Sequence, residues 1–360
     1  MEEQFMRRAI ELAKQGLGWT SPNPMVGAVI VKDGRVIGEG YHHRCGELHA
    51  ERNALAACSE DPAGATMYVT LEPCCHTGRT PPCTEAILER GIARVVVGSR
   101  DPNPKVAGGG VAVLRSHGID VTEDFLRTEC DALNPVFFHY ITTKTPYVAM
   151  KYAMTADGKI ATCTGASKWI TGETARQHVH TLRHRYTGIM AGIGTVLADD
   201  PMLNCRIDGG RDPVRIICDS RLRIPLDSQL CRTAGEQRTI VACAQGDPEK
   251  KTILEAMGIT VLDLPDETGR VDLPALMAAL GAMEIDGILL EGGGTLNEDM
   301  LQKGLVNRVY AYIAPKIFGG REAKTPVEGR GFLTPDDCVH LSQPTVSVLG
   351  EDLMLEYEVL

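Results

Sequence analysis

The chain has 360 residues, of which 43% are hydrophobic and 23% charged, and its formal net charge is −10. This length suits two domains, and the composition is that of an ordinary globular protein that buries sizeable cores. The negative charge argues against a broad nucleic-acid-binding surface, although local basic patches remain available for phosphate groups. No apolar run is long enough to span a membrane, so we expect neither nucleic acid nor a membrane as a partner.

Twelve cysteines are scattered without the regular spacing of a disulfide framework. The first residues, MEEQFMRRAIELAKQG, predict an amphipathic helix and lack the basic and apolar regions of a secretory signal peptide. We therefore expect a cytoplasmic protein with reduced thiols. In that compartment, clustered Cys and His residues indicate a metal or catalytic site before they indicate disulfides.

The first part of the chain predicts strands that alternate with helices. After the first helix, two apolar runs flank KDGR (32–35), and Asp-Gly between apolar runs is typical of a β-hairpin. The elements predicted next are helices that open at His49 and Cys83, buried strands over 66–73 and 93–99, and helices over 123–133 and 135–143. A hairpin followed by such units predicts a sheet that is sandwiched by helices.

A second α/β pattern begins after Pro146, so we expect two domains, residues 1–145 and 146–360. The linker is short, because nothing around it is of low complexity. The predicted strands of this half cover 147–155, 188–192, 214–220, 259–264, 287–293, 309–318 and 353–359. The predicted helices cover 174–185, 250–258, 273–283 and 296–304.

A candidate metal site is formed by HAE at residues 49–51, PC at 73–74 and Cys83. Zinc nucleobase deaminases carry these residue types in this order, with one His and two Cys as ligands and the Glu as a proton carrier. A catalytic zinc takes three protein ligands and leaves its fourth position to water. His49 and Cys83 each open a predicted helix, whose N-terminus stabilises a thiolate. The pattern predicts zinc on His49, Cys74 and Cys83, with Glu51 catalytic.

The choice between neighbouring ligands stays open at this level. The rivals are Cys45, Cys58, Cys75 and His76. We prefer Cys74 because it follows a proline as the signature requires, and we expect Cys75 to pack beside the site. Eight residues, instead of two, separate Cys74 from Cys83, and this insertion carries Arg79. An Arg fork suits a phosphate, and a solvated loop charge is the alternative for it.

Two glycine turns follow predicted strands in the second half, MAGIGT (190–195) and EGGGT (291–295). A glycine turn before a helix lets backbone N–H groups and the helix dipole hold a phosphate. Neither turn is the G-x-G-x-x-G of a dinucleotide fold, so a plain turn explains each one singly, but two in one domain favour a dinucleotide. The loop DSRLR (219–223) suits the 2′-phosphate of NADP, with a surface turn as the alternative.

Charged residues accompany these turns. Lys151 interrupts an apolar strand, which is costly unless its amine is paired or reaches a cleft. A lysine on an edge strand is an equal alternative. Asp199 and Glu291 lie beside the glycine turns, and Arg183 and Arg206 are candidate anchors for a substrate phosphate.

Several stretches resemble a known family, the bifunctional riboflavin biosynthesis deaminase/reductase. SPNPMVGAVIV, HAE, EPCCHTGRTPPC and DPNPKVAGGG are similar to its deaminase half, over about residues 2–139. KYAMTADGKIAT, SKWITG, MAGIGTVLADDP, LNCR, DSRLRIP and EGGGTLN are similar to its reductase half, from residue 146 nearly to the end. The resemblance implies an α/β fold, with a cytidine-deaminase-like α/β/α sandwich followed by a dihydrofolate-reductase-like domain. It also implies Zn²⁺ and NADPH as cofactors.

The resemblance further implies residue roles. In the deaminase half it implies substrate contacts at Asn23, His42, Arg79 and Asn103. In the reductase half it implies NADPH contacts at Ala153, Trp169, Thr195, Asp199, Ser220, Gly293, Gly294 and Thr295. It implies substrate contacts there at Ser167, Arg183, Leu203, Arg206 and Glu291, with Lys151 as a catalytic residue near the reacting carbon.

The implied function is hydrolytic deamination of 2,5-diamino-6-ribosylamino-4(3H)-pyrimidinone 5′-phosphate, followed by NADPH-dependent reduction of its ribosyl group to a ribityl chain. The partner is thus a small phosphorylated pyrimidine, and the resemblance also suggests a homo-oligomer. One alternative is a deaminase that edits nucleic acid, against which the acidic charge and the lack of an aromatic–basic stretch argue. The other is a deaminase fused to a nucleotide-binding sensor module without reductase activity. A purely structural zinc site would require a fourth protein ligand.

Overall fold

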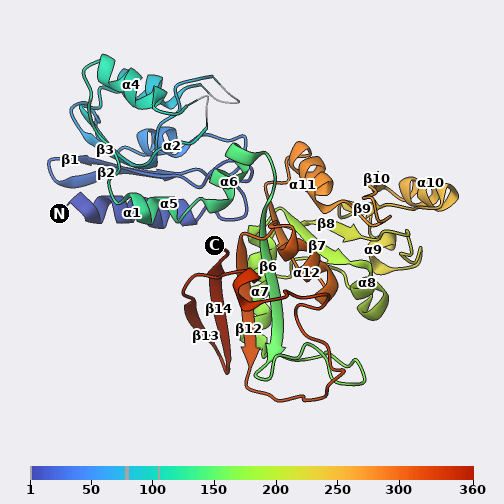
Figure 1. The fold of residues 1–360 in the computed structure, drawn as a ribbon. Coiled ribbons are helices and arrows are strands. Elements are labelled where there is room, and N and C mark those ends of the chain that lie inside the picture. The colour runs from blue at the N-terminus through green and yellow to red at the C-terminus, as the bar shows by residue number, and fades with distance from the viewer. Residues whose placement is uncertain (1, 78–80, 104–105) are drawn as a thin grey trace. The chain divides into compact units, whose positions relative to one another are not determined.

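The computed structural model describes residues 2–77, 81–103 and 106–360 (Figure 1). Contacts divide the chain into two compact units, Met1–Lys144 and Thr145–Leu360. Each unit contains one β-sheet with helices packed on it, so the predicted α/β fold class is confirmed. Within the described residues, no helix has both the length and the apolar character that crossing a membrane requires.

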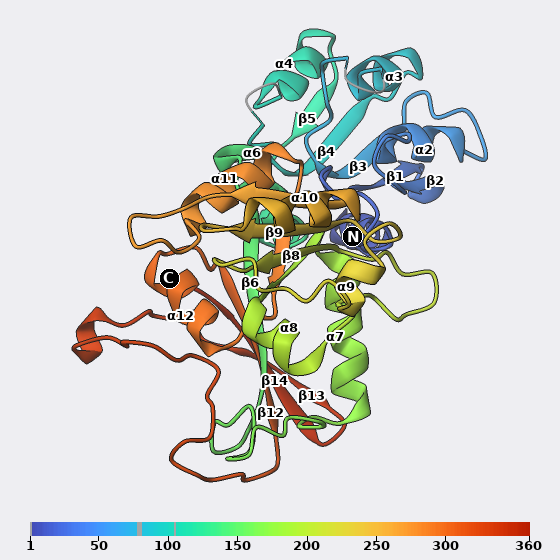
Figure 2. The same cartoon turned by 90° about the vertical axis from the view of Figure 1, so that its right-hand side faces the viewer.

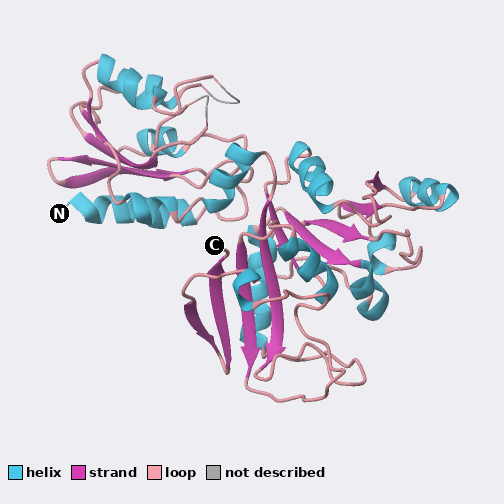
Figure 3. Ribbon diagram, in the orientation of Figure 1, coloured by secondary structure: helices cyan, strands magenta, loops and turns pink. Residues whose placement is uncertain are grey.

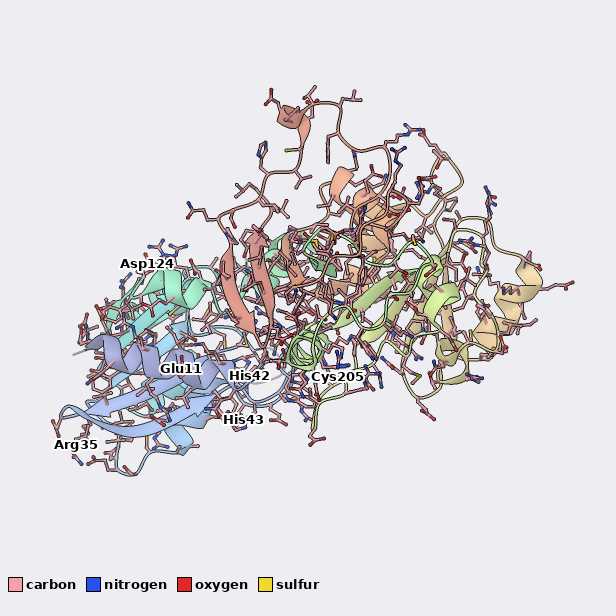
Figure 4. The ribbon with its side chains drawn as sticks, turned by 90° about the horizontal axis from the view of Figure 1, so that it is seen from below. Glu11, Arg35, His42, His43, Asp124 and Cys205 are labelled. Carbon is pink, nitrogen blue, oxygen red and sulfur yellow. The ribbon has the colours of Figure 1, made fainter. Side chains whose placement is uncertain are left out.

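The first unit is built on a five-stranded sheet with the strand order β2-β1-β3-β4-β5. Its strands are β1 (Gly27–Lys32), β2 (Arg35–Tyr41), β3 (Thr66–Leu71), β4 (Arg94–Ser99) and β5 (Asp120–Thr122). Its helices are α1 (Glu2–Lys14), α2 (Ala50–Ala56), α3 (Cys83–Glu89), α4 (Gly109–Ser116), α5 (Arg127–Asp131) and α6 (Pro135–Thr143). The expected hairpin joins β1 to β2, and both turn residues, Asp33 and Gly34, have positive φ, as a tight two-residue turn requires. Arg35 and Asp124 mark opposite edges of this sheet (Figure 4).

Alternation along the strands gives this sheet two buried faces. Ile30, Met67 and Val95 point to the core that α2, α3 and α4 cover. Their neighbours on the other face, including Val29 and Val96, pack against α1 and α5. Figure 3 shows helices on both sides of this sheet. Because successive side chains of a strand point to opposite faces, continuous apolar runs are needed where both faces are covered.

The second unit contains a nine-stranded sheet with the order β10-β9-β8-β7-β11-β6-β12-β14-β13. Its strands are β6 (Tyr147–Thr155), β7 (Gly188–Gly192), β8 (Val214–Cys218), β9 (Thr239–Cys243), β10 (Ile259–Asp263), β11 (Gly287–Leu290), β12 (Arg308–Ala314), β13 (Thr345–Leu349) and β14 (Asp352–Glu358). Along this sheet order, each strand from β10 through β9, β8, β7, β11 and β6 to β12 pairs in parallel with the next. Strands β14 and β13 then add an antiparallel edge.

Helices cover both faces of this sheet. They are α7 (Glu173–Arg185), α8 (Ile193–Asp199), α9 (Gln229–Arg232), α10 (Pro248–Ala256), α11 (Leu273–Ala282) and α12 (Gly294–Gln302), and a short 3-10 turn, η1, covers Pro335–Asp337. Helices α11 and α12 bury the face that carries Met150 and Leu290, and α8 to α10 bury the face that carries Ala191 and Val241 (Figure 2). Functional groups placed after the parallel strands therefore gather at one edge of the sheet.

Some element boundaries differ from the sequence predictions. β12 stops at Ala314, because Pro315 cannot donate to the ladder, and β11 stops at Leu290, where the glycine turn begins. β5, β9, β13, α4 and α9 were not predicted, and α8 was predicted only as a helix-like segment after its glycine turn. β9 contains a four-residue apolar run without alternation, and α4 begins in three glycines, so neither shows a periodic signal.

Candidate active sites

The three predicted zinc ligands converge in the first unit. Nδ1 of His49 lies 3.5 Å from Sγ of Cys74 and 3.4 Å from Sγ of Cys83. Among the described residues, they form the group of His, Cys, Asp and Glu that could hold a metal, with ligand atoms within 4.8 Å of one another. His49 caps α2, Cys83 opens α3, and Cys74 follows β3. One imidazole and two sulfurs leave the fourth position of a tetrahedral zinc open, which fits a catalytic ion.

The sulfur of Cys74 is prepared to be a thiolate. Hydrogen bonds from the Cys83 thiol and from His49 lower the pKa of Cys74 to about 4, against the opposing effect of burial. The backbone N–H of Cys83, at the start of α3, also donates to this sulfur at 3.3 Å. The pKa of Cys83 is raised by its hydrogen bond with Cys74 and by burial.

Glu51 lies beside the ligands on the first turn of α2 and is only 3% exposed. Burial raises the pKa of its carboxyl, and the negative charge of Cys74 acts in the same direction. A carboxyl at this place can take a proton from water and pass it to a leaving group. The structure thus places Glu51 where the sequence pattern requires a proton carrier.

A second His borders this group. His42, just after β2 (Figure 4), packs edge-on against His49 with ring centroids 5.3 Å apart. Its Nδ1 lies 3.1 Å from the carbonyl oxygen of Leu48, so it donates there and Nε2 is left to accept from Nδ2 of Asn23 at 3.3 Å. Burial lowers the pKa of His42, so the imidazole stays neutral. Asn23 and His42 therefore form one hydrogen-bonded pair next to His49.

The remaining candidates of the first unit are placed less directly. Asn103 lies on the loop after β4, where its backbone N–H donates to Oδ1 of Asp101 at 2.8 Å. Arg79 lies outside the described residues. Cys75 does not join the metal group among the described residues, and its Sγ instead packs beside Gly109 at the start of α4.

In the second unit the two glycine turns are neighbours. Gly192 caps α8 and Gly293 caps α12, and these helices follow the paired parallel strands β7 and β11. A Cβ added to Gly293 would lie 3.9 Å from Oγ1 of Thr195. A Cβ added to Gly192 would likewise lie 3.8 Å from the side chain of Leu296 in α12. Two helix N-termini without side-chain caps thus present free N–H groups at one edge of the sheet, which suits a phosphate.

Lys151, Glu291 and Arg183 form a partly buried ion network. Nζ of Lys151 lies 3.0 Å from Oε2 of Glu291, and Arg183 donates to both carboxylate oxygens, at 2.7 and 3.1 Å. Burial raises the pKa of Glu291, but the charges of Arg183 and Lys151 outweigh it and hold this pKa well below its usual value. Lys151 does not lie on an edge strand, because β6 is in the interior of the sheet. Its amine is instead paired with Glu291.

Arg206 is held by a residue that sequence reasoning missed, His180. Nε and Nη2 of Arg206 lie 3.2 and 3.1 Å from Nε2 of His180. Burial, with the charges of Arg183 and Arg206, lowers the pKa of His180 to about 4, so it remains a neutral acceptor. His180 precedes Arg183 by three residues on α7, a helical spacing that could have revealed it.

The other predicted contacts lie around these groups. Ala153 follows Lys151 by two residues and shares its face of β6. Trp169 is 62% exposed, and the guanidinium of Arg176 stacks on its ring at 4.7 Å. Ser167 lies on the same loop as Trp169, and Oδ1 of Asp199 lies 3.9 Å from Nζ of Lys168. Gly294 and Thr295 form the first turn of α12, and Leu203 is buried.

Ser220 is set apart from these residues, on the loop after β8. Its hydroxyl oxygen accepts from the backbone N–H of Val271 at 3.2 Å. The preceding Asp219 is fully buried and accepts from the N–H of Ile224, which folds the basic loop of Arg221 and Arg223. Because β8 is the neighbour of β7, this loop lies at the same edge of the sheet as the Gly192 turn.

The fold and these two sites define a class of protein, one that joins a deaminase-type metal centre to a nucleotide-dependent reductase unit. Residues 146–355 match the RibD C-terminal domain family, and residues 1–99 match the cytidine and deoxycytidylate deaminase zinc-binding region. The riboflavin biosynthesis protein RibD of Actinobacillus pleuropneumoniae is 57% identical, over 99% of this chain and 95% of its own. RibD of Escherichia coli is 42% identical, over 88% and 89%.

Solved structures agree with these matches. Acinetobacter baumannii RibD superposes with a TM-score of 0.90 at 38% identity, over 100% of this chain and 99% of the other. The diaminohydroxyphosphoribosylaminopyrimidine deaminase/5-amino-6-(5-phosphoribosylamino)uracil reductase of Thermotoga maritima superposes with a TM-score of 0.86 at 38% identity, over 99% and 98%. The chain belongs to the RibD family of riboflavin biosynthesis proteins.

Proposed function

We propose that one chain catalyses two steps of riboflavin biosynthesis at the two sites described above. The first unit hydrolytically deaminates 2,5-diamino-6-ribosylamino-4(3H)-pyrimidinone 5′-phosphate, and the second reduces the ribosyl group of the product to ribityl with NADPH. The observation that carries this proposal is the convergence of His49, Cys74 and Cys83 beside the buried Glu51. The Lys151–Glu291–Arg183 network beside two helix N-termini supports the second step.

In the deaminase unit, His49, Cys74 and Cys83 would hold zinc. Bound zinc supplies a water whose pKa is lowered to roughly 7. Glu51 takes the proton of the attacking water and passes it to the departing amine, so that ammonia leaves. Its burial keeps this proton transfer away from bulk solvent. Asn23 and His42, which are hydrogen-bonded to each other beside His49, orient the pyrimidine ring.

In the reductase unit, NADPH supplies the hydride when bound. The N-terminal turns of α8 and α12 bind its phosphates, and Trp169 covers an exposed part of the nucleotide. Lys151, held by Glu291, stands next to the sugar carbon that is reduced and stabilises charge on the ring oxygen as the sugar opens. Arg206, oriented by His180, binds the substrate phosphate.

Simultaneous recording of ammonia release and NADPH oxidation tests the assignment. The purified chain receives the diamino ribosylamine phosphate and NADPH, and a parallel sample receives NADPH alone. We expect both signals with the pyrimidine and neither without it. Ammonia without NADPH oxidation would instead support the alternative of a deaminase fused to a sensor module.

Metal binding offers a prediction about individual cysteines. Zinc content is expected to be about one ion per chain and to fall by about tenfold or more in Cys74→Ser, because a neutral hydroxyl is a poor replacement for a thiolate ligand. The matched control is Cys75→Ser, which alters the next residue and should retain zinc. Zinc lost equally from both variants, in atomic-absorption measurements on the purified chain, would refute the assignment of Cys74.

We also propose a cytoplasmic location and a small-molecule partner. No disulfide links the cysteines in the described part of the chain, as expected in a reducing compartment. The formal net charge of −10 speaks against a nucleic-acid partner. Self-association as a homo-oligomer remains part of the proposal, supported by family resemblance.

A further inference from the structure

Glu72 is a buried carboxylate that the chemistry described so far does not use. It follows β3 directly, two residues before Cys74, and is 4% exposed. Its Oε2 accepts from the backbone N–H of Gly108 at 3.0 Å. Its Oε1 accepts from the N–H groups of Gly110 and Val111, at 3.0 and 3.2 Å. Glu72 therefore caps the start of α4 from a distant part of the chain, where the free N–H groups and the helix dipole favour negative charge.

The three glycines at this helix start allow very close packing. A Cβ added to Gly110 would lie 2.0 Å from the carbonyl oxygen of Pro73, and one added to Gly109 would lie 2.9 Å from Sγ of Cys75. The first turn of α4 thus rests on the backbone of Pro73 and on the side chain of Cys75, the two residues that flank Cys74. These contacts give a steric reason for Gly109 and Gly110 in the sequence DPNPKVAGGG, and the positive φ of Gly108 favours glycine at the first position.

The turn that leads into α4 is bonded to Asn103. The N–H groups of Val106 and Ala107 donate to the carbonyl oxygen of Asn103 at 2.8 and 2.9 Å. On its other side, Asn103 donates its own N–H to Asp101, whose pKa burial raises to about 6. A chain of hydrogen bonds therefore runs from Glu72, through the start of α4, to Asn103.

We propose that Glu72 is a positioning residue of the deamination site. By clamping the start of α4 onto the strand end that carries Cys74, it fixes Asn103 relative to the zinc ligands and so sets the affinity for the pyrimidine. The inference rests on the proposed deaminase function and on Asn103 as a substrate contact. It adds to them a residue that touches neither substrate nor metal.

The test is a comparison of Glu72→Gln with Gly110→Ala. Glutamine keeps the shape of Glu72 but turns an NH₂ group toward backbone N–H donors, and alanine pushes α4 off Pro73 while leaving Glu72 intact. For ammonia release, each variant should raise KM for the pyrimidine about tenfold or more while kcat stays within about threefold of wild type. Zinc content should not change, and NADPH oxidation with the deaminated pyrimidine supplied directly should stay at the wild-type rate.

Two controls match these changes elsewhere in the chain. Asp272→Asn alters a carboxylate that caps α11 through the N–H of Ala275, and Gly235→Ala adds a Cβ with no atom within 4 Å. Both should leave KM for deamination unchanged.

An unchanged KM in both variants would overturn the inference. So would parallel losses of zinc and kcat at constant KM, since that pattern indicates a purely structural clamp. If Glu72→Gln fails to fold, Gly110→Ala decides. If wild type releases no ammonia, the proposed function itself fails and the inference with it, a result that the KM comparison cannot mimic.

Discussion

Glu51→Gln is expected to lower the rate of ammonia release by about 10³-fold, the middle of the range for removing a general acid–base group. Glutamine has the shape of the buried glutamate but cannot take a proton from water or return it to the amine. His49, Cys74 and Cys83 remain intact, so the zinc content should stay at the wild-type level. The measurement is ammonia release at saturating substrate, together with metal analysis of the same sample.

The second unit supplies an internal control for this variant. NADPH oxidation should stop with the diamino substrate, because its deaminated product no longer forms. It should proceed at the wild-type rate when the deaminated pyrimidine is supplied. The surface change Glu89→Gln, on the exposed side of α3, should affect neither reaction. A Glu51→Gln chain that deaminates within about threefold of wild type would exclude Glu51 as the proton carrier.

Lys151→Ala should reduce kcat for NADPH oxidation by about 10²-fold or more with the deaminated pyrimidine as substrate, as expected for loss of a positioned charge at a reacting centre. The fold should survive, because Arg183 still donates to both oxygens of Glu291 and neutralises that buried carboxylate. Deamination in the first unit should be unaffected. Lys151→Ala therefore tests the chemistry of the second unit without disrupting its fold.

Nucleotide binding by the Lys151→Ala chain can be followed through tryptophan fluorescence. The protein has two tryptophans, and the exposed Trp169 is the one expected at the nucleotide site. In a Trp19→Phe background, NADPH should quench Trp169 equally with and without Lys151. Lys251→Ala, which removes a surface ion pair with Asp263, is the control for lysine loss. Wild-type kcat in Lys151→Ala would refute a catalytic role, and lost quenching would show that Lys151 serves nucleotide binding instead.

Much of the first site could be predicted from the sequence because its residues are local to element ends. The order of HAE, PC and Cys83 on a helix, a strand end and a second helix is enough to predict that they meet, and the structure brings them within 4.8 Å. The hairpin at Asp33-Gly34 could also be predicted from the sequence, because its positive φ values favour those residue types. The α/β fold class followed from runs of apolar residues alternating with helical periods.

Other features depend on tertiary structure alone. Neither the adjacency of the two glycine turns nor the pairing of Lys151 with Glu291 could be read from the sequence, because strand order in a parallel sheet differs from chain order.

The side chains that hold functional groups in place could not be predicted from the sequence either. His180 holds Arg206, which lies 26 positions further along the chain. Glu72 holds the start of α4, which lies 36 to 39 positions further along the chain. The sequence by itself determined the fold class, the metal-binding residue types and the family. Only the tertiary structure decided which polar side chains hold these groups in place, because a buried hydrogen bond is selected by packing geometry and leaves no periodic trace in the chain.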